Sequence, residues 1–118
     1  MIDKISAVTL ATADMARAVD FYRRLGFEIL HGGRDGDFTS FRVGEGYLNL
    51  ALRPGYSPGE PWGRTIFYVS DVDAMHSRAL DAGLHPETQP ADATWNERYF
   101  HILDPDGHEL SFAKPLPR

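Results

Sequence analysis

Apolar residues recur along the chain in two patterns, one that alternates as in a half-buried strand and one that returns every three to four residues as in an amphipathic helix. The helical pattern occurs twice, and each time it follows an aspartate and stops before a glycine. Asp14 and Asp71 have the position of N-caps, and Gly26 and Gly83 lie where a helix ends in a left-handed residue. The residues expected on the buried helix faces are Met15, Ala18, Val19, Tyr22 and Leu25 in the first helix and Val72, Met75, Ala79 and Ala82 in the second.

Alternating runs surround both helices and predict strands. One run precedes each helix, at residues 5–11 and 65–69, and the others follow at residues 27–30, 38–43, 47–52, 99–103 and 109–113. The last two runs are separated by Asp104-Pro105-Asp106-Gly107, which has the residue types of a type I turn. Each half of the chain has the order strand, helix, meander of strands, which predicts an α+β fold with helices packed on one sheet face.

The two halves are related by an internal repeat. Residues 8–28 align without gaps on residues 65–85, a shift of 57 positions that places Asp14 on Asp71 and Gly26 on Gly83. We expect one structural unit used twice, with a first module at residues 1–55, a linker rich in proline and glycine at 56–63, and a second module at 64–118.

Alternation also divides the strand side chains between two sheet faces. Apolar residues such as Leu48, Leu50 and Phe112 are expected to cover the helices, so their neighbours point to the opposite face. That opposite face is polar and aromatic, which is typical either of a solvated surface or of the wall of a ligand cleft. Its residues are Ala7, Thr9, Ala11, Ser40, Arg42, Tyr47, Asn49, Ala51, Arg64, Ile66, Tyr68, Tyr99, His101, Glu109, Ser111 and Ala113.

Composition narrows the classes of function. The 118 residues include no cysteine, which excludes disulfides, thiolate zinc sites, iron–sulfur clusters and a cysteine nucleophile. Seventeen acidic and twelve scattered basic residues give a formal charge of −5, so we expect no nucleic-acid partner. We find neither a membrane span nor a signal peptide in the sequence, so we expect a cytoplasmic protein without a membrane partner.

Three stretches carry a resemblance to a known family, namely AVTLATADMARAVDFYRRLGFE, FYVSDVDAMHSRALDAG and YFHILDPDGHELSFAKP. In their order and spacing they resemble the vicinal oxygen chelate superfamily, which includes glyoxalases, bleomycin-resistance proteins and extradiol dioxygenases. The resemblance spans essentially the whole chain and implies two tandem βαβββ modules that form a curled sheet around a central cleft, with a homodimer as the expected assembly. It implies no single activity, because the superfamily holds lyases, isomerases, transferases, oxygenases and binding proteins.

Metal-using members of that superfamily place four ligands on the first and last strands of the modules, usually His or Gln, Glu, His and Glu. The resemblance puts these positions at Ala7, Asn49, Arg64 and Ser111. Alanine has no donor atom, the amide and the hydroxyl are neutral, and the guanidinium repels a cation. We therefore expect no metal and no other cofactor, and we expect the metal-dependent reactions to be absent.

The expected cleft is suited instead to a small polar or anionic metabolite or an antibiotic-like molecule. Arg64 offers a fork of donors, Asn49 and Ser111 offer neutral donors, and the tyrosine rings offer walls. The full set of expected ligand-binding residues is Arg42, Tyr47, Asn49, Arg64, Tyr68, Tyr99, His101 and Ser111. An alternative for Arg64 is an ion pair with Glu109 across the cleft that merely offsets its charge.

Two other functions stay open. His101, beside Tyr99 and Glu109, could act as the general base of a metal-free lyase or isomerase. Alternatively, the chain could be a non-catalytic interaction module whose cleft is filled by its own side chains.

The remaining aromatic, histidine and charged residues receive simpler expectations. Trp62 and Trp95 lie in loops, where each could close the cleft, fill a subunit interface or pack on its own loop. His76 is expected to be structural. The residues expected to be solvent-exposed are His31, His85 and His108 near turns and Glu97 and Arg98 on a rim.

Overall fold

The computed structural model describes residues 1–59 and 62–117, and these contain eight strands and two helices. The order is β1 (Ala7–Thr12), α1 (Met15–Arg24), β2 (Glu28–His31), β3 (Phe38–Val43), β4 (Gly46–Leu52), β5 (Arg64–Tyr68), α2 (Val72–Asp81), β6 (Ala91–Asp92), β7 (Glu97–Leu103) and β8 (Glu109–Pro115). The chain divides into two compact units, Met1–Pro58 and Gly59–Arg118, called the first and the second module below. Residues 60 and 61 of the predicted linker and residue 118 lie outside the described residues.

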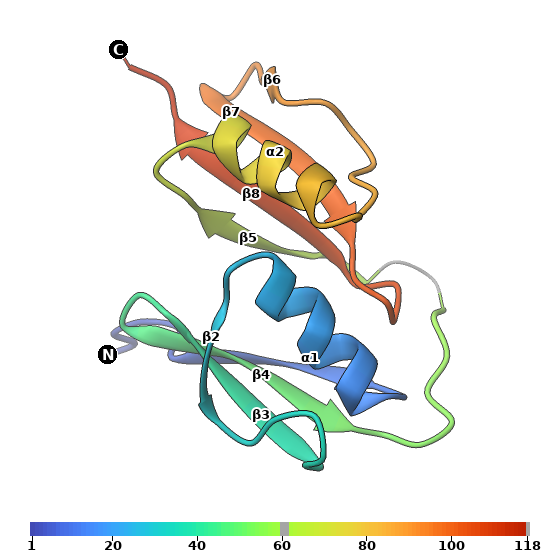
Figure 1. Cartoon of the computed structure of the whole chain (residues 1–118). Coiled ribbons are helices and arrows are strands. Elements are labelled where there is room, and N and C mark those ends of the chain that lie inside the picture. Colours follow the sequence, from blue (N-terminus) through green and yellow to red (C-terminus); the bar gives the residue numbers. More distant parts are fainter. Residues whose placement is uncertain (60–61, 118) are drawn as a thin grey trace. The chain divides into compact units, whose positions relative to one another are not determined.

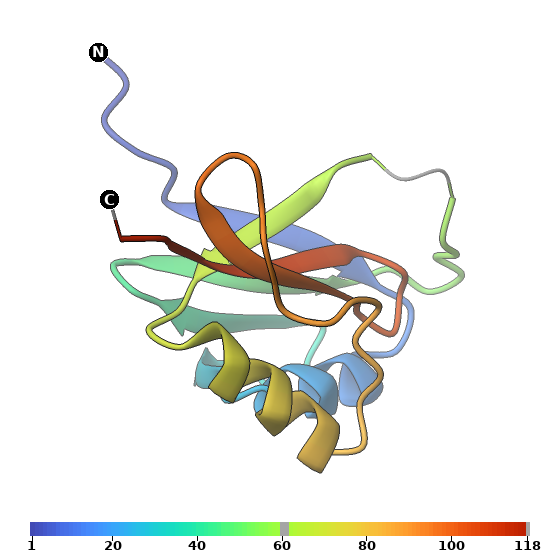
Figure 2. The same ribbon diagram turned by 90° about the horizontal axis from the view of Figure 1, so that it is seen from above.

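Each module has one four-stranded mixed sheet, with the order β1-β4-β3-β2 in the first and β5-β8-β7-β6 in the second. The first strand of each module pairs in parallel with the last, and the remaining pairs are antiparallel. Figure 1 shows α1 across one face of the first sheet and α2 across one face of the second. In Figure 2 the residues before β1 extend away from the first sheet. The predicted α+β fold and its twofold repetition are confirmed.

The two helices begin and end at the predicted residues for the predicted reasons. The carboxylates of Asp14 and Asp71 accept hydrogen bonds from the first-turn amides of α1 and α2. Gly26 and Gly83 have φ angles of 95° and 79°, and their amides bond back to carbonyls of the last turn. Both ends are Schellman motifs, in which the left-handed glycine allows the chain to leave the helix toward the next strand.

Aromatic rings fill the space between each helix and its sheet. In the first module Tyr22 is fully buried, with its ring centroid 5.2 Å from that of Phe27 and 5.5 Å from that of Phe41. In the second module Phe112 stacks on Phe67 and on Phe100, each at 5.4 Å. Burying one such side chain contributes roughly 1.5–3 kcal/mol to folding.

The second helix is less deeply buried than the first. Met75 and Ala82, expected in the core, are half-buried, whereas His76 is buried with its ring edge against Phe100 at 5.1 Å. This contact agrees with the structural role expected for His76.

Two local expectations were wrong, and one short strand was missed. His108 is only 5% exposed, because its amide donates to Asp104 Oδ1 at 3.0 Å and its Nδ1 accepts from Trp62 Nε1 at 3.3 Å. Glu97 and Arg98 are half-buried and form the start of β7 instead of a rim. The two-residue strand β6 was not expected at all.

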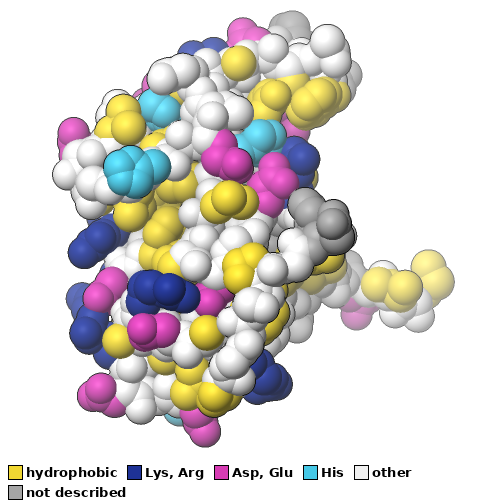
Figure 3. All heavy atoms as spheres, turned by 90° about the vertical axis from the view of Figure 1, so that its right-hand side faces the viewer, with side chains coloured by type: hydrophobic (Ala, Val, Ile, Leu, Met, Phe, Trp, Pro, Cys, Tyr) yellow, Lys and Arg dark blue, Asp and Glu magenta, His cyan; other side chains and the backbone are white. Residues whose placement is uncertain are grey.

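The surface mixes charges of both signs. On the face shown in Figure 3, Lys and Arg side chains alternate with Asp and Glu side chains over both modules. Both helices have ten residues, and in the described part of the chain neither has the length and apolar character needed to cross a membrane.

Candidate functional site

The second sheet has one face away from α2, and its side chains form three cross-strand rows. Strand register places Arg64 beside Glu109, then Ile66 beside Ser111 and His101, then Tyr68 beside Ala113 and Tyr99. Beyond the third row, Glu97 lies two residues before Tyr99 in the sequence and therefore on the same side of β7. We call this set the second helix-free face. Its composition changes from a charged pair at one end to rings and a carboxylate at the other.

Arg64 lies at the charged end and contacts two neighbours. Its Nη1 is 3.2 Å from His101 Nε2, and its Nη2 is 3.4 Å from Glu109 Oε1. The arginine side chain is 42% exposed, so it is held by these partners and still reachable from solvent. The ion pair with Glu109 that was expected as an alternative for Arg64 is present. It joins neighbouring strands of one sheet, so its expected placement across a cleft was wrong.

His101 connects Arg64 to Ser111. A guanidinium has only donors, so His101 Nε2 must accept from Arg64, and His101 Nδ1 then carries the proton and donates to Ser111 Oγ at 2.7 Å. Burial, followed by the charge of Arg64, lowers the pKa of His101 from its ordinary value of 6.5, against opposing effects of Glu109 and Glu87. The imidazole is thus a neutral group with both nitrogens engaged.

Aromatic side chains occupy the other end of the second helix-free face. The rings of Tyr99 and His101 lie 4.9 Å apart, and those of Trp95 and Tyr99 lie 5.4 Å apart at an interplanar angle of 34°. Trp95 Nε1 donates to Glu97 Oε1 at 3.1 Å, and the Tyr68 hydroxyl donates to Glu97 Oε2. The pKa of Tyr68 is raised above its ordinary value, first by this hydrogen bond to Glu97 and then by burial and by the charge of Glu97.

The corresponding face of the first sheet has a row of neutral hydrogen-bonding groups and, one row further, an arginine. Ser40 Oγ donates to Asn49 Oδ1 at 2.7 Å, and Asn49 Nδ2 donates to Thr9 Oγ1 at 3.2 Å, which gives a hydrogen-bonded row across β3, β4 and β1. Arg42 lies opposite Tyr47 in the register, and its Nε is 4.0 Å from Glu28 Oε2. We call this the first helix-free face.

The positions that hold metal in other members of the resembled superfamily do not fit a divalent cation here. Ala7 has no donor atom, both ends of the Asn49 amide bind neighbouring hydroxyls, and Arg64 carries a positive charge. Ser111 Oγ, which is buried, is bonded to His101. Among the described residues there is also no group of three or more His, Asp or Glu side chains placed to hold a metal ion. We therefore derive no reaction step through a metal.

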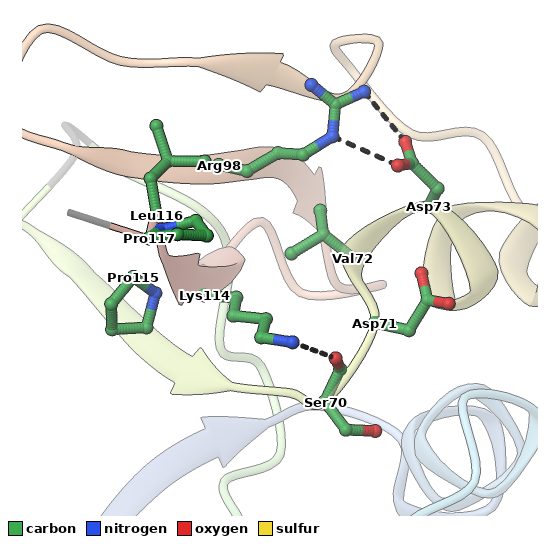
Figure 4. Close-up of a pocket in the computed structure, with 9 residues that line it drawn as sticks. All are labelled: Ser70, Asp71, Val72, Asp73, Arg98, Lys114, Pro115, Leu116 and Pro117. Atoms are coloured by element: carbon green, nitrogen blue, oxygen red, sulfur yellow. Dashed lines mark hydrogen bonds and ion pairs between the residues drawn. The ribbon is translucent and has the colours of Figure 1, made fainter.

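A separate pocket of about 250 Å³ lies at the start of α2, between that helix and the end of β8 (Figure 4). Its polar groups already have partners: Arg98 forms two hydrogen bonds with Asp73, and Lys114 Nζ donates to the Ser70 carbonyl at 2.9 Å. A further bond joins Arg98 to Asp92 at 2.9 Å. Arg98 and Lys114 thus connect the start of α2 and β6 to the sheet, which favours a structural role for the residues of this pocket.

The predicted site residues fall into two sets, one in each module. Arg42, Tyr47 and Asn49 lie on the first helix-free face, where only Asn49 is bonded to other side chains of the row. On the second helix-free face Arg64, His101 and Ser111 are in direct contact, with Tyr99 stacked against His101 and Tyr68 one row further. Glu97 was not predicted as a site residue, although its position two residues before Tyr99 places it on the same side of an alternating strand.

The chain belongs to the Glyoxalase/Bleomycin resistance protein/Dioxygenase superfamily, whose family model matches residues 4–112. This confirms the resemblance found in the sequence. Among solved structures, the chain is similar to a bleomycin-binding protein in complex with bleomycin, with a TM-score of 0.76, 23% identity, and coverage of 96% of this chain and 98% of the other. TioX from Micromonospora sp. ML1 matches with a TM-score of 0.78, 28% identity, and coverage of 97% and 100%.

Curated relatives give shorter or weaker matches. A metallothiol transferase, FosB, of Shouchella clausii is 29% identical over 93% of this chain and 79% of its own length. An uncharacterised protein of Mycobacterium bovis is 44% identical over 48 residues, which are 41% of this chain and 32% of the relative. The match to this mycobacterial relative thus spans about a third of its length.

Proposed function

We propose that the protein is a metal-independent binding protein for a small, flat, polar molecule, such as an aromatic metabolite or an antibiotic-like compound. The observation that carries this proposal is the second helix-free face, where a row of rings continues directly into the hydrogen-bonding groups of His101, Arg64 and Ser111. A wall of rings with a few fixed polar groups is the usual composition of a small-molecule site. On this face the proposed contacts are Arg64, Tyr68, Tyr99, His101 and Ser111, all predicted from the sequence. The expected contacts Arg42, Tyr47 and Asn49 lie on the first helix-free face, and their part in ligand binding stays a prediction.

The similarity to a bleomycin-binding protein supports binding over chemistry, since that relative is described by its complex with bleomycin. The similarity to a metallothiol transferase favours chemistry, but the donor set described above lacks the imidazole and carboxylate groups that a catalytic divalent metal requires. Binding without a metal is the function that the residues themselves support best.

The hydrogen bonds of His101 argue against its use as a general base. A base needs a lone pair directed at the substrate, and the lone pair of Nε2 is occupied by the Arg64 guanidinium. The Nδ1 proton points to Ser111. We therefore assign His101 the task of orienting Arg64, whose remaining N–H donors are offered to a carbonyl or carboxylate of the ligand.

Ligand binding is tested with purified protein in buffer containing EDTA, using metal-free bleomycin and a panel of small aromatic amides, amines and carboxylates. We expect at least one compound to raise the melting temperature, because a ligand at a hundred times its Kd adds about 2.7 kcal/mol of stability. Trp95→Leu and Arg64→Ala should each lower the affinity for that compound about tenfold or more, and the rise in melting temperature should be smaller accordingly. Asp81→Asn, on the helix side of the sheet, is the control.

Two results contradict the proposal. One is stabilisation that disappears in EDTA and returns with a divalent metal. The other is a purified protein that holds stoichiometric zinc, nickel, manganese or iron. A panel in which no compound shifts the melting temperature would support the interaction module instead.

The expected assembly and location belong to the same proposal. We expect a homodimer, the assembly that the family resemblance implies, and a cytoplasmic location. Light scattering on the purified protein measures the assembly, and a monomer at micromolar concentration would contradict it.

A further inference from the structure

We propose that the aromatic end of the second helix-free face is a subsite for an organic cation, formed by the Glu97 carboxylate and the rings of Trp95, Tyr68 and Tyr99. This inference rests on the proposed function, because it names the chemical class of molecule that the same face binds. The ligand is expected to carry an ammonium group beside its flat portion.

The charges on this face favour a cation over an anion. Arg64 is matched by Glu109 at 3.4 Å, so the pair adds little net charge. Glu97 contacts Trp95 and Tyr68, and in the described part of the chain both of these partners are neutral. His101 is neutral as well, as its hydrogen bonds require. Among the described residues Glu97 therefore has no cationic partner, and its negative charge lies among the rings.

The carboxylate of Glu97 is held in place before any ligand binds. Trp95 Nε1 bonds one oxygen and the Tyr68 hydroxyl bonds the other, which fixes both the carboxylate and the two rings relative to each other. A carboxylate oxygen has further lone pairs, so both oxygens can still accept from an ammonium group. Fixing the site in advance reduces the entropy lost when a ligand binds.

The rings add attraction of the same sign. The faces of tryptophan and tyrosine are negative, and a cation within about 6 Å of a ring centroid is attracted to them. Trp95 and Tyr68 are 60% and 65% exposed, so their faces are accessible to a small molecule. Between Tyr68 and Tyr99 the register places Ala113, which is buried, so the two rings lie on either side of a small, covered side chain.

Strand alternation separates this subsite from the arginine beside it in the sequence. Arg98 follows Glu97 directly, but it binds Asp73 at the start of α2 and Asp92 in β6. Its charge is therefore neutralised by two carboxylates of its own and does not cancel that of Glu97.

The test uses three probes with the same ring and different charge: benzylammonium, benzyl alcohol and benzoate. Binding to the full chain is followed at neutral pH by the NMR signal of the Trp95 indole N–H, with the Trp62 indole, which is bonded to His108, as internal reference. We expect benzylammonium to bind at least about fivefold more tightly than benzyl alcohol. Benzoate should bind more weakly than both.

Variants assign the preference to Glu97. Glu97→Gln keeps the shape and removes the charge, and it should abolish the preference for benzylammonium while leaving the affinity for benzyl alcohol within about twofold. Asp81→Asn removes the same charge at the end of α2, on the helix side of the sheet, and should leave the preference unchanged. Trp95→Leu should lower the affinity for all three probes. Because this variant lacks the Trp95 indole, binding to it is measured from the shift of the Tyr99 ring signals.

The outcomes separate this inference from the proposed function. Equal affinity for benzylammonium and benzyl alcohol, a preference that survives in Glu97→Gln, or tightest binding of benzoate that persists in Arg64→Ala would overturn the cation subsite and leave small-molecule binding in place. Failure of all three probes also overturns the subsite, and combined with a silent compound panel it overturns the proposed function.

Discussion

At the scale of single residues, neighbouring side chains decide the chemistry of each polar group. The sequence identifies His101 as a histidine on a polar sheet face, which is compatible with a base, a metal ligand or a structural residue. The contacts with Arg64 and Ser111 favour the structural role, because they leave a neutral ring with no lone pair available for a proton or a metal ion. These contacts depend on strand register, so no local sequence pattern contains them.

The first prediction concerns the pKa of His101. Burial is the larger cause of its lowering and remains when Arg64 is replaced by leucine, but the repulsion by the guanidinium is removed. We expect the pKa of His101 to rise in Arg64→Leu. Histidine NMR titrations measure the change, with assignment by His101→Gln.

The sign of the linkage follows from the same shift. Because the pKa is lower in the folded state, His101 contributes stability that is present above its unfolded pKa of about 6.5 and is lost as the pH falls through the folded pKa. In Arg64→Leu the free energy of unfolding should therefore lose less through the protonation of His101 as the pH falls. An unchanged or lowered pKa in Arg64→Leu contradicts the assigned contact, and Arg78→Ala on α2 is the control for a lost positive charge.

The second prediction concerns Tyr68. Its hydrogen bond to the Glu97 carboxylate is the largest cause of its raised pKa, followed by burial and by the charge of Glu97. Glu97→Gln removes the first and the third, so the pKa of Tyr68 should fall toward its ordinary value of 10.0. Ultraviolet or NMR titration of the phenols measures the shift, and a titration identical to that of Asp81→Asn would show that the bond does not form in solution.

At the scale of elements, the local signals were sufficient where capping residues and apolar spacing agreed. Asp14, Gly26, Asp71 and Gly83 fixed both helices to within a residue, because a cap acts on the amides and carbonyls nearest to it. Strand β7 was predicted two residues short, since Glu97 and Arg98 are both polar and hide the alternation. The burial of His108 also escaped prediction, because it depends on Trp62, which is distant in the sequence.

The third prediction tests the end of α2. Gly83 has a φ of 79°, and an added Cβ would meet no atom within 4 Å, so a substitution there meets backbone strain without a steric clash. We expect Gly83→Ala to lower the free energy of unfolding by about 1 kcal/mol. Gly83→Asn should cost clearly less, because asparagine tolerates the left-handed conformation. Urea unfolding measures both, and an alanine variant as stable as the asparagine variant would contradict this account.

At the scale of the whole molecule, the sequence predicted the architecture better than it predicted the sites. The repeat and the family resemblance gave two modules with matching element order, and the structure has them. Equivalent positions of the repeat nevertheless carry different chemistry, since Ala7 and Ser40 correspond to Arg64 and His101 in the second module. The fold requires only that these helix-free positions alternate with apolar ones, so their identities are free to change without loss of the fold.

The last prediction separates the charge of the molecule from the charge of one residue. The chain carries a formal charge of −5, and such a field attracts any cation, but it acts over distances that salt screens within about 10 Å. The contact with Glu97 is shorter and partly enclosed by rings, so it should persist in salt. Between about 50 mM and about 500 mM sodium chloride we expect the preference for benzylammonium over benzyl alcohol to shrink by roughly twofold to threefold without vanishing.

The charge-matched variants then decide between the two origins. If the whole field were responsible, Asp81→Asn and Glu97→Gln would reduce the preference equally, because each changes the net charge by one, and high salt would abolish it. If the local carboxylate is responsible, only Glu97→Gln abolishes it, and it does so at both salt concentrations. Titrations of the Trp95 indole signal in the three proteins at two salt concentrations give the six values required, and equal losses in the two variants would reject a local site.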